Sequence, residues 1–531
     1  MISKHKFTVI SLLLLLFVTY SLEAQNSNET HKYWVLFKDK PNVNFDPFEH
    51  FDSKAIERRM IQELPLYDWY DLPVDSEYKN EIEKNVQEIK TESRWLNALV
   101  VIATQKEISK IKEFHFVKEI NEAGTSELLI AEEEEPSDDL VMLSRQTERM
   151  GIDLFDSLGL NGTGMRVAIF DVGFNGAKTH EAFKHIYEKN RVKLTYDFVK
   201  KREDVYSGGS HGTAVWSCIG GRLQNRWSGM AHEAEFLLAR TEIGMREPFS
   251  EEENWIVAAE WADKNGADII NSSLGYTHNR YFPTEMDGKT SFVTKGANIA
   301  AKKGILVVNA AGNEGSGNWK LIGAPADADS VLSIGGVVPC CDYKTGFSSF
   351  GPTADGRLKP NVMAQGTAWC AKPVGEGSMD GTSFASPLAA GFAACAWQHD
   401  RKLGNMELFR KLEACGSLYP YFDYGHGYGV LSAQNFIGTD ENTEAKFEVL
   451  DAKVDNETFY KIVVNDDILN AFTSPGSILL YVSVFNQNGK LDSYKVIDVS
   501  EKEAYSFSSS EIEPNSVIKL FLQGYLKEIK F

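Results

Sequence analysis

Short apolar runs alternate with helix-like segments from residue 140 to about residue 438, and this alternation limits the fold more strongly than any other feature of the sequence. Apolar strands that alternate with helices are typical of a parallel sheet covered by helices on both faces. The predicted strands are residues 166–170, 236–240, 268–271, 305–309 and 331–334, and the predicted helices are residues 212–220, 253–264, 297–303 and 383–399. In folds of this kind, active sites lie at the carboxyl ends of the strands.

Two smaller units flank this α/β domain, to which we assign residues 140–440. Residues 25–139 contain strand-like and helix-like segments in a small α+β pattern and end in an acidic, proline-containing run at 132–139 that is typical of a linker. Residues 445–531 contain four strand-like runs and the hairpin signal Asn488-Gly489, which together predict a β-sandwich.

The chain begins with the features of a secretory signal. Lys4 and Lys6 precede a 14-residue apolar run, and Ala24 offers a small residue at a cleavage site. The run is shorter than the roughly 20 residues that span a membrane, and we predict no transmembrane segment. We therefore expect residues 1–24 to be a signal peptide and the protein to be secreted to the extracellular space, the periplasm or the cell surface. A short membrane anchor is the alternative interpretation of this segment.

Charge and cysteine usage exclude two classes of function. The net charge is −20, from 75 acidic and 55 basic residues, which argues against a nucleic-acid partner because phosphate binding needs a basic surface. No CxxC pair is present, so we predict no zinc site. Six cysteines in an exported protein permit disulfides, but they allow 15 pairings and the sequence does not choose among them.

Four segments place a reactive or polar side chain beside glycine. Asp171 ends a predicted strand, His211 and Ser383 each open a predicted helix, and Asn313 follows a predicted strand. Each segment alone has an ordinary explanation, as a helix cap, a surface histidine or a glycine turn. All four in this order and on this sheet pattern are far harder to obtain by accident than any one of them alone.

At these segments the chain resembles the subtilisin-like serine proteases, the subtilases. The resemblance covers about residues 140–435 and rests on short motifs. These motifs are D-x-G at Asp171, H-G-T at His211, G-T-S-x-A-x-P around Ser383, and the oxyanion-hole asparagine at Asn313. It implies a serine endopeptidase with an Asp–His–Ser triad made by Asp171, His211 and Ser383, acting through an acyl-enzyme intermediate.

The resemblance also implies how substrate binds. Ser273, Leu274 and Gly275 match the family's strand that lies beside an extended protein or peptide substrate. Gly323 matches the bottom of the pocket for the residue before the scissile bond, where glycine leaves room for a large side chain, and Glu314 matches the rim of that pocket. No cofactor is implied, and calcium enters only as a structural ion that no segment of this sequence clearly matches.

The same resemblance implies functions for the two flanking units. Residues 25–139 resemble the family's propeptide, which inhibits its own peptidase until it is removed, with a permanent N-terminal domain as the alternative. The C-terminal β-sandwich resembles accessory or sorting domains of exported bacterial proteases, with a unit required for folding as the alternative.

Two other functions compete with the protease. One is a catalytically inactive subtilase fold that serves as a binding scaffold, which the intact Asp171, His211, Ser383 and Asn313 disfavour. The other is an α/β-hydrolase esterase, which would need G-x-S-x-G and the order serine, acid, histidine, whereas this chain has the reverse order.

Overall fold

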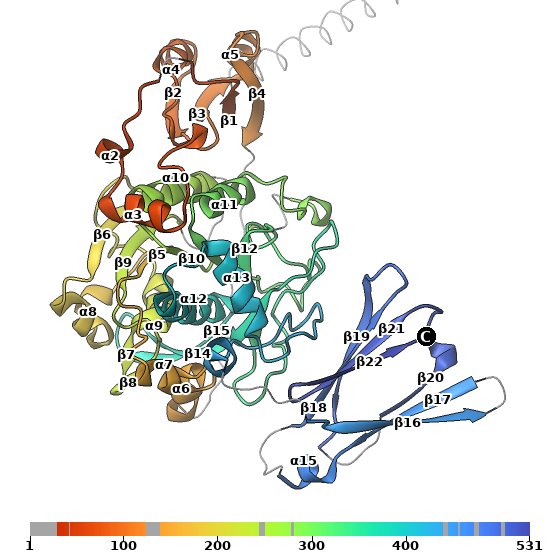
Figure 1. Ribbon diagram of the computed structural model, residues 1–531. Helices are drawn as coiled ribbons and strands as arrows, with labels where there is room; N and C mark the ends of the chain where they lie inside the picture. Colours follow the sequence, from red (N-terminus) through yellow and green to blue (C-terminus); the bar gives the residue numbers. More distant parts are fainter. Residues whose placement is uncertain are drawn as a thin grey trace, which may run out of the picture.

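The structure is a computed structural model that describes residues 29–41, 43–123, 139–243, 250–277, 281–438, 444–454, 457–471, 477–500 and 505–531. The predicted signal peptide and nearly all of the predicted linker lie outside these residues. Three units follow one another along the chain, and the second, which we call the central unit, is the largest (Figure 1). Among the described helices, none is long and apolar enough to cross a membrane.

A parallel sheet forms the middle of the central unit. Its strand order is β13-β12-β11-β10-β5-β9-β6, and every neighbouring pair in this order is parallel. The strands are β5 (Arg166–Asp171), β6 (Val192–Asp197), β9 (Glu235–Arg240), β10 (Ile269–Ser272), β11 (Leu306–Ala310), β12 (Val331–Val337) and β13 (Val362–Gln365). All residues of β10 and β11 are buried, which is why these strands are continuously apolar or small in the sequence.

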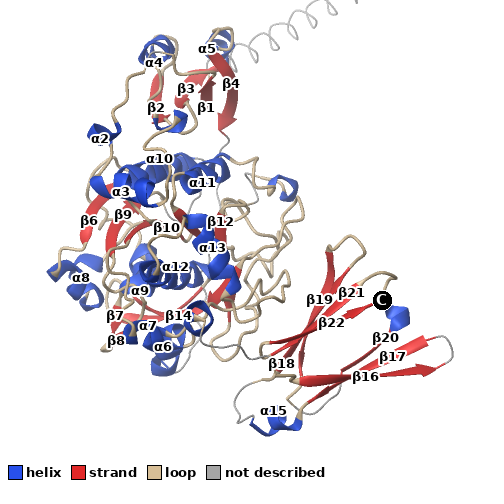
Figure 2. Cartoon of the chain, viewed as in Figure 1, coloured by secondary structure: helices blue, strands red, loops and turns tan. Residues whose placement is uncertain are grey.

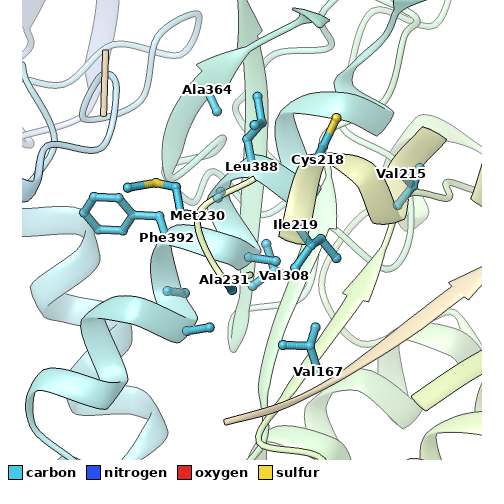
Figure 3. Close-up of a cluster of buried hydrophobic side chains, with 14 of the residues drawn as sticks. Val167, Val215, Cys218, Ile219, Met230, Ala231, Val308, Ala364, Leu388 and Phe392 are labelled. Carbon is cyan, nitrogen blue, oxygen red and sulfur yellow. The ribbon is translucent and has the colours of Figure 1, made fainter. Parts of the chain in front are cut away.

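Helices cover both faces of this sheet (Figure 2), so the predicted fold class is confirmed. On one face lie α9 (His211–Gly220) and α12 (Thr382–His399), and on the other lie α10 (Ser250–Lys264) and α11 (Phe292–Lys302). Alternate residues of β5 serve the two faces: Val167 packs in the cluster around α9 and α12 (Figure 3), whereas Ala168 packs in the cluster with α10 and α11.

Further helices complete the central unit around this core. They are α6 (Asp139–Glu148), α7 (Ile152–Ser157), α8 (Lys184–Glu188), α13 (Asn405–Ala414) and α14 (Ala433–Ile437). A hairpin of β14 (Thr367–Ala371) and β15 (Glu376–Asp380) leads directly into α12, and the strand pattern of the sequence did not predict it. A second, two-residue hairpin joins β7 (Arg222–Leu223) to β8 (Arg226–Trp227).

The N-terminal unit is an antiparallel sheet with two helices packed on it. The strand order is β2-β3-β1-β4, from β1 (Thr30–Phe37), β2 (Glu88–Ser93), β3 (Ala98–Thr104) and β4 (Val117–Ala123). The helices on it are α4 (Ser76–Glu83) and α5 (Gln105–Ile111), which contribute Ile82, Ile108 and Ile111 to its core. Between β1 and α4 the chain leaves the sheet and forms α2 (Pro47–His50) and α3 (Ser53–Ile61).

The C-terminal unit consists of two antiparallel sheets that share one apolar core, as the predicted β-sandwich requires. One sheet has the order β16-β17-β20, and the other has the order β19-β18-β21-β22. The strands are β16 (Phe447–Val454), β17 (Glu457–Val464), β18 (Leu479–Phe485), β19 (Leu491–Asp498), β20 (Tyr505–Ser508), β21 (Val517–Leu522) and β22 (Tyr525–Lys530), and the helix α15 (Asp466–Ala471) follows β17. Gly489 has a φ of 73°, as expected for the glycine of the β18–β19 hairpin turn.

The C-terminal unit contacts the central unit through aromatic side chains. Tyr421 of the central unit is fully buried, and its ring lies 5.7 Å from that of Tyr481 and 5.9 Å from that of Phe521. Leu491 packs in the same way with Phe422 and Tyr424. The sandwich is therefore joined to the central unit by buried apolar surface.

Candidate active site

Asp171 and His211 lie in direct contact at the carboxyl end of the sheet. Asp171 is the last residue of β5 and is fully buried, and His211 is the first residue of α9. The Nδ1 atom of His211 lies 3.0 Å from Oδ1 and 2.9 Å from Oδ2 of Asp171. The backbone N–H of Val172 donates to Asp171 Oδ1 at 2.8 Å, which holds the carboxylate in place.

Glycine in the H-G-T motif has a steric reason. A Cβ atom at Gly212 would lie 2.6 Å from the carbonyl oxygen of Gly173 and 2.9 Å from Cβ of Asp171. Only a residue without a side chain lets the start of α9 come this close to the end of β5. The motif thus brings the imidazole to the carboxylate, and the contact assigns the proton to Nδ1, on the aspartate side, so that Nε2 carries the lone pair of a base.

Ser383 is the second residue of α12, next to Phe384, which contacts His211. The N-cap Gly381 has a φ of 147°, a conformation that favours glycine, and Phe384 places its ring 5.4 Å from that of His211. The hydroxyl of Ser383 donates to the carbonyl oxygen of Ser273 at 3.2 Å, and the hydroxyl of Ser273 donates to the carbonyl oxygen of Ser383 at 2.8 Å. The predicted nucleophile is therefore hydrogen-bonded to the residue that follows β10.

Asn313 is oriented by Thr382. Its Oδ1 atom accepts two hydrogen bonds, from the backbone N–H and from the hydroxyl of Thr382, each at 2.9 Å. These bonds direct the amide nitrogen away from Thr382, and that nitrogen lies 3.3 Å from the position a Cβ atom would take at Gly381. The backbone N–H of Ser383 lies in the first turn of α12, where N–H groups lack partners within the helix. Two donors suited to an oxyanion thus lie at the start of this helix.

Thr382 is the residue that sequence reasoning missed. It holds Asn313 and also accepts a hydrogen bond from the backbone N–H of Gly312 at 3.2 Å. The only hint in the sequence is its place directly before Ser383 in the G-T-S motif.

The predicted substrate-binding residues 273–275 and Gly323 lie on two neighbouring backbone segments. Beside Gly275 no atom lies within 4 Å of a Cβ position, so space is open there, while Ser273 and Leu274 are mostly buried. Tyr276 and Ala324 exchange backbone hydrogen bonds of 2.8 and 3.1 Å, which brings Gly323 next to the strand-like segment 273–276.

Gly323 and Glu314 lie in different surroundings. A Cβ atom at Gly323 would lie 2.7 Å from the methyl group of Thr277 and 3.0 Å from the carbonyl oxygen of Tyr276, so any side chain there would crowd residues 276 and 277. Glu314 is half-buried, directly after Asn313, and its backbone N–H donates to the hydroxyl of Ser349 at 3.1 Å.

All six cysteines are free thiols in the structure. Cys218 on α9 and Cys370 on β14 are fully buried, with their sulfur atoms 3.4 Å apart, and burial raises the pKa of Cys370 well above its ordinary value. In the described parts of the chain, no group of three or more His, Cys, Asp or Glu side chains is placed to hold a metal ion, and structural calcium stays a prediction.

Known proteins match the chain over these same regions. The model of the subtilase family of S8 peptidases matches residues 162–427, and the model of the peptidase S8 propeptide domain of Bacteroidota matches residues 32–137. The chain is 30% identical to a subtilisin of Bacillus pumilus over 282 residues, which covers 52% of this chain and 92% of the relative. It is also 30% identical to subtilisin NAT of Bacillus subtilis subsp. natto over 284 residues, covering 52% of this chain and 67% of the relative. Alkaline elastase YaB of a Bacillus strain is 27% identical over 327 residues, covering 59% of this chain and 77% of the relative.

Proposed function

The chain belongs to the subtilase family and is a serine-type endopeptidase, and from this premise we propose that Asp171, His211 and Ser383 form its catalytic triad. The observation that carries the proposal is the contact of both Asp171 carboxylate oxygens with Nδ1 of His211, at 3.0 and 2.9 Å. This contact sets the tautomer in which Nε2 accepts a proton, and Ser383 directly precedes Phe384, whose ring lies 5.4 Å from that of His211.

The first half of the reaction acylates the enzyme. A substrate that lies beside residues 273–275 competes for the carbonyl oxygen of Ser273, so the hydroxyl of Ser383 turns to Nε2 of His211. His211 takes the hydroxyl proton while Oγ bonds to the peptide carbonyl carbon, and the amide nitrogen of Asn313 and the backbone N–H of Ser383 bind the oxyanion. The carbon–nitrogen bond then breaks, His211 gives its proton to the leaving amine, and the acyl group stays on Ser383 as an ester.

The second half releases the acyl group. A water molecule attacks the ester carbonyl while His211 takes one of its protons, the same donors bind the second oxyanion, and Ser383 leaves as the alcohol after protonation by His211. Asp171 stabilises the imidazolium in both halves and stays ionised.

Substrates are extended protein or peptide chains held by the backbone of residues 273–275. By the family resemblance, Gly323 lies at the bottom of a pocket for a large apolar or aromatic side chain before the scissile bond, and Glu314 at the rim attracts basic side chains. The predicted signal sequence and the family match of the N-terminal unit support secretion as a precursor whose propeptide inhibits the peptidase. The role of the C-terminal sandwich as an accessory or sorting domain rests on its position after the peptidase.

Labelling with a fluorophosphonate tests the triad directly, together with casein hydrolysis. The wild-type chain is expected to be labelled at Ser383 and to cleave casein, and Ser383→Ala is expected to lose both properties with its fold intact. Ser157→Ala, which changes an exposed serine at the end of α7, is the matched control and should behave as wild type. Absence of labelling in the wild-type chain would favour the inactive scaffold, and hydrolysis of simple esters without casein cleavage would favour an esterase.

A further inference from the structure

The segment of the propeptide between its strands β1 and β2 makes its own contact with the peptidase domain, next to the contact made by the propeptide sheet. We call residues 46–71, with helices α2 and α3 and the short 3-10 helix Trp69–Asp71, the strap. In Figure 1 the strap descends from the sheet of the N-terminal unit, and α3 lies against the central unit beside α10 and α11. The backbone N–H of Asp52 donates to the carbonyl oxygen of Lys264 at 2.8 Å. The side-chain amide of Gln62 donates to the carbonyl oxygen of Gly304, also at 2.8 Å.

Two adjacent arginines of α3 meet one buried carboxylate of the peptidase domain. Arg59 donates to Asp263 Oδ2 at 2.7 Å, and Arg58 donates to Asp263 Oδ1. Arg58 also donates to the carbonyl oxygen of Ala267 and, at 3.1 Å, to that of Lys303. We call the group formed by the Asp263 carboxylate and these two carbonyl oxygens the arginine socket. The planar fork of a guanidinium matches such a set of acceptors better than an ammonium does.

This contact excludes water almost completely. The side chains of Arg58 and Arg59 are 1% exposed, and that of Asp263 is 0% exposed. Burial alone would raise the pKa of Asp263, but the two guanidinium groups outweigh burial and hold its pKa below the ordinary value. Removing one partner of such a pair leaves a buried charge uncompensated, so loss of the arginines or of Asp263 has a large cost in free energy.

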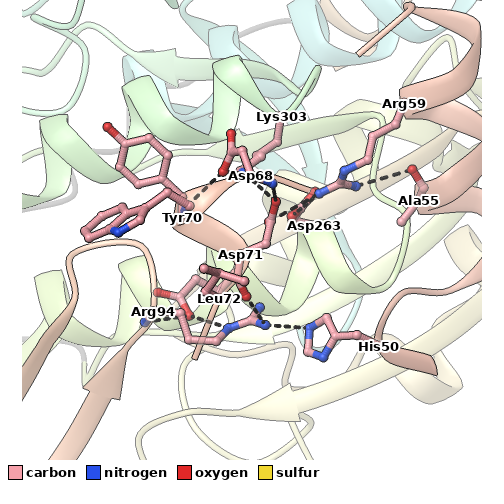
Figure 4. A network of polar contacts seen from close by, with 12 residues as sticks. His50, Ala55, Arg59, Asp68, Tyr70, Asp71, Leu72, Arg94, Asp263 and Lys303 are labelled. Carbon is pink, nitrogen blue, oxygen red and sulfur yellow. Dashed lines mark hydrogen bonds and ion pairs between the residues drawn. The ribbon is translucent and has the colours of Figure 1, made fainter. Parts of the chain in front are cut away.

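A second ion pair runs in the opposite direction beside the first, as Figure 4 shows. Lys303 of the peptidase domain, 3% exposed, reaches Asp68 Oδ1 at 2.5 Å and Asp71 Oδ2 at 2.7 Å, both on the strap. Each surface therefore presents both signs of charge, and the pattern fits only in one register.

The socket lies at the amino ends of the sheet strands, whereas the catalytic residues lie at the carboxyl ends. Ala267 precedes β10 and Lys303 precedes β11, so both carbonyl oxygens mark the amino ends of strands, whereas Ser273 follows the carboxyl end of β10. The four residues of β10 alone separate the amino end of this strand from its carboxyl end by about 13 Å.

The propeptide sheet makes a neighbouring contact, about one turn away on α10. There, Glu260 of α10 accepts hydrogen bonds from the hydroxyl of Ser93 at 2.7 Å and the backbone N–H of Trp95 at 3.1 Å. The ring of Trp34 stacks on that of Phe292 with the centroids 5.1 Å apart. The strap thus adds a second anchoring point to the one made by the sheet.

From this geometry we infer that the peptidase domain carries a propeptide-binding site remote from its active site, the arginine socket, whose ligand is the guanidinium pair of Arg58 and Arg59. The socket contributes to holding the propeptide on the peptidase domain after the chain is cut between the two domains. The inference rests on the proposed function for the biological meaning of that cut, but the binding itself does not depend on catalysis.

A binding experiment on the full chain tests the socket. The starting protein carries Ser383→Ala and a recognition site for a sequence-specific protease at residues 132–135, so that an added protease makes the cut. After the cut, dissociation of the propeptide is followed by size-exclusion chromatography and by biolayer interferometry. Arg58→Ala with Arg59→Ala is expected to accelerate dissociation at least about 100-fold, because the two changes together leave Asp263 buried without a guanidinium partner. Lys84→Ala, at a lysine of the propeptide whose side chain is 69% exposed, is the matched control and should leave the rate unchanged.

Two further measurements keep the outcome decisive if the arginine variants fail to fold. The dipeptide Arg-Arg, added to the cut protein with its native strap, should displace the propeptide at concentrations where Lys-Lys at equal ionic strength does not. The combination of Asp263→Leu with Arg58→Met and Arg59→Met, which removes all three charges, should bind more tightly than the Asp263→Leu variant alone. Dissociation within twofold of wild type for the arginine variant, or equal displacement by Arg-Arg and Lys-Lys, would overturn the socket. Self-cleavage of the Ser383→Ala chain before protease is added would instead contradict the proposed triad.

Discussion

Replacing Thr382 by valine measures how strongly the oxyanion donor depends on its orientation. Asn313 Oδ1 accepts two hydrogen bonds from Thr382, each at 2.9 Å, and valine removes the one from the hydroxyl while keeping the shape of the side chain. The net value of one neutral hydrogen bond is about 0.5–1.5 kcal/mol, so we expect kcat to fall about 2- to 10-fold with KM nearly unchanged. Asn313→Ala removes the donor itself and should lower kcat about 10²- to 10³-fold, the size known for subtilisin's oxyanion asparagine.

The assay is steady-state hydrolysis of a chromogenic peptide by the processed enzyme. Thr382→Ser is the matched control, since it retains the hydroxyl and should recover most of the wild-type kcat. Valine also leaves the backbone N–H of Gly312 without its acceptor, so thermal melting of each variant in the Ser383→Ala background separates lost stability from lost catalysis. If Asn313→Ala leaves kcat within threefold of wild type, the oxyanion role of Asn313 is refuted. If Thr382→Val lowers kcat as much as Asn313→Ala does, the estimate that one orienting hydrogen bond contributes about 0.5–1.5 kcal/mol is refuted.

Three further predictions concern specificity, pH and the C-terminal unit. Peptide libraries should show a preference for large apolar or aromatic residues before the cut. Gly323→Val should shift this preference to small residues, because the valine side chain would occupy part of the pocket that glycine leaves open. A wild-type profile dominated by Gly or Asp would contradict this prediction. Burial and, second to it, the charge of Arg357 lower the pKa of Lys359 to about 7. Between about pH 7 and pH 10 the lysine is therefore neutral in the folded chain but protonated in the unfolded chain. The free energy of unfolding then rises with pH by up to about 1.4 kcal/mol per pH unit. Lys359→Met should remove this rise in melting experiments on the Ser383→Ala chain, and an unchanged pH slope would count against a neutral lysine there. Truncation after residue 440 uncovers Tyr421 and should lower the melting temperature, whereas an unchanged melting temperature with full casein activity would mark the sandwich as a separable appendage.

Several parts of the fold and the site were predictable because their causes are local. The strands β5, β9, β10, β11 and β12 are visible as short apolar runs, since both of their faces are buried. The motif around His211 is visible because Gly212 is demanded by close approach to the end of β5, and the start of α12 because Gly381 has a positive φ. By contrast, β15 has the sequence EGSMD, which is polar and contains glycine, so only its pairing with β14 makes it a strand.

The sequence by itself determined the fold class, the family and the four residues of the candidate active site, because close backbone approach and strand burial leave a mark on neighbouring residues. Only the tertiary structure decided what those residues contact: the hydroxyl of Ser383 bonds to Ser273, and Thr382 holds Asn313. It also decided the role of Arg58 and Arg59, which in the sequence are two charges on an amphipathic helix, a pattern that normally marks a solvated face. Their partner Asp263 is more than 200 residues away along the chain, and the burial of all three follows from how the strap lies on the peptidase domain. Long-range pairing of this kind leaves no periodicity in the sequence, because each charge is stabilised by a residue that only folding brings near.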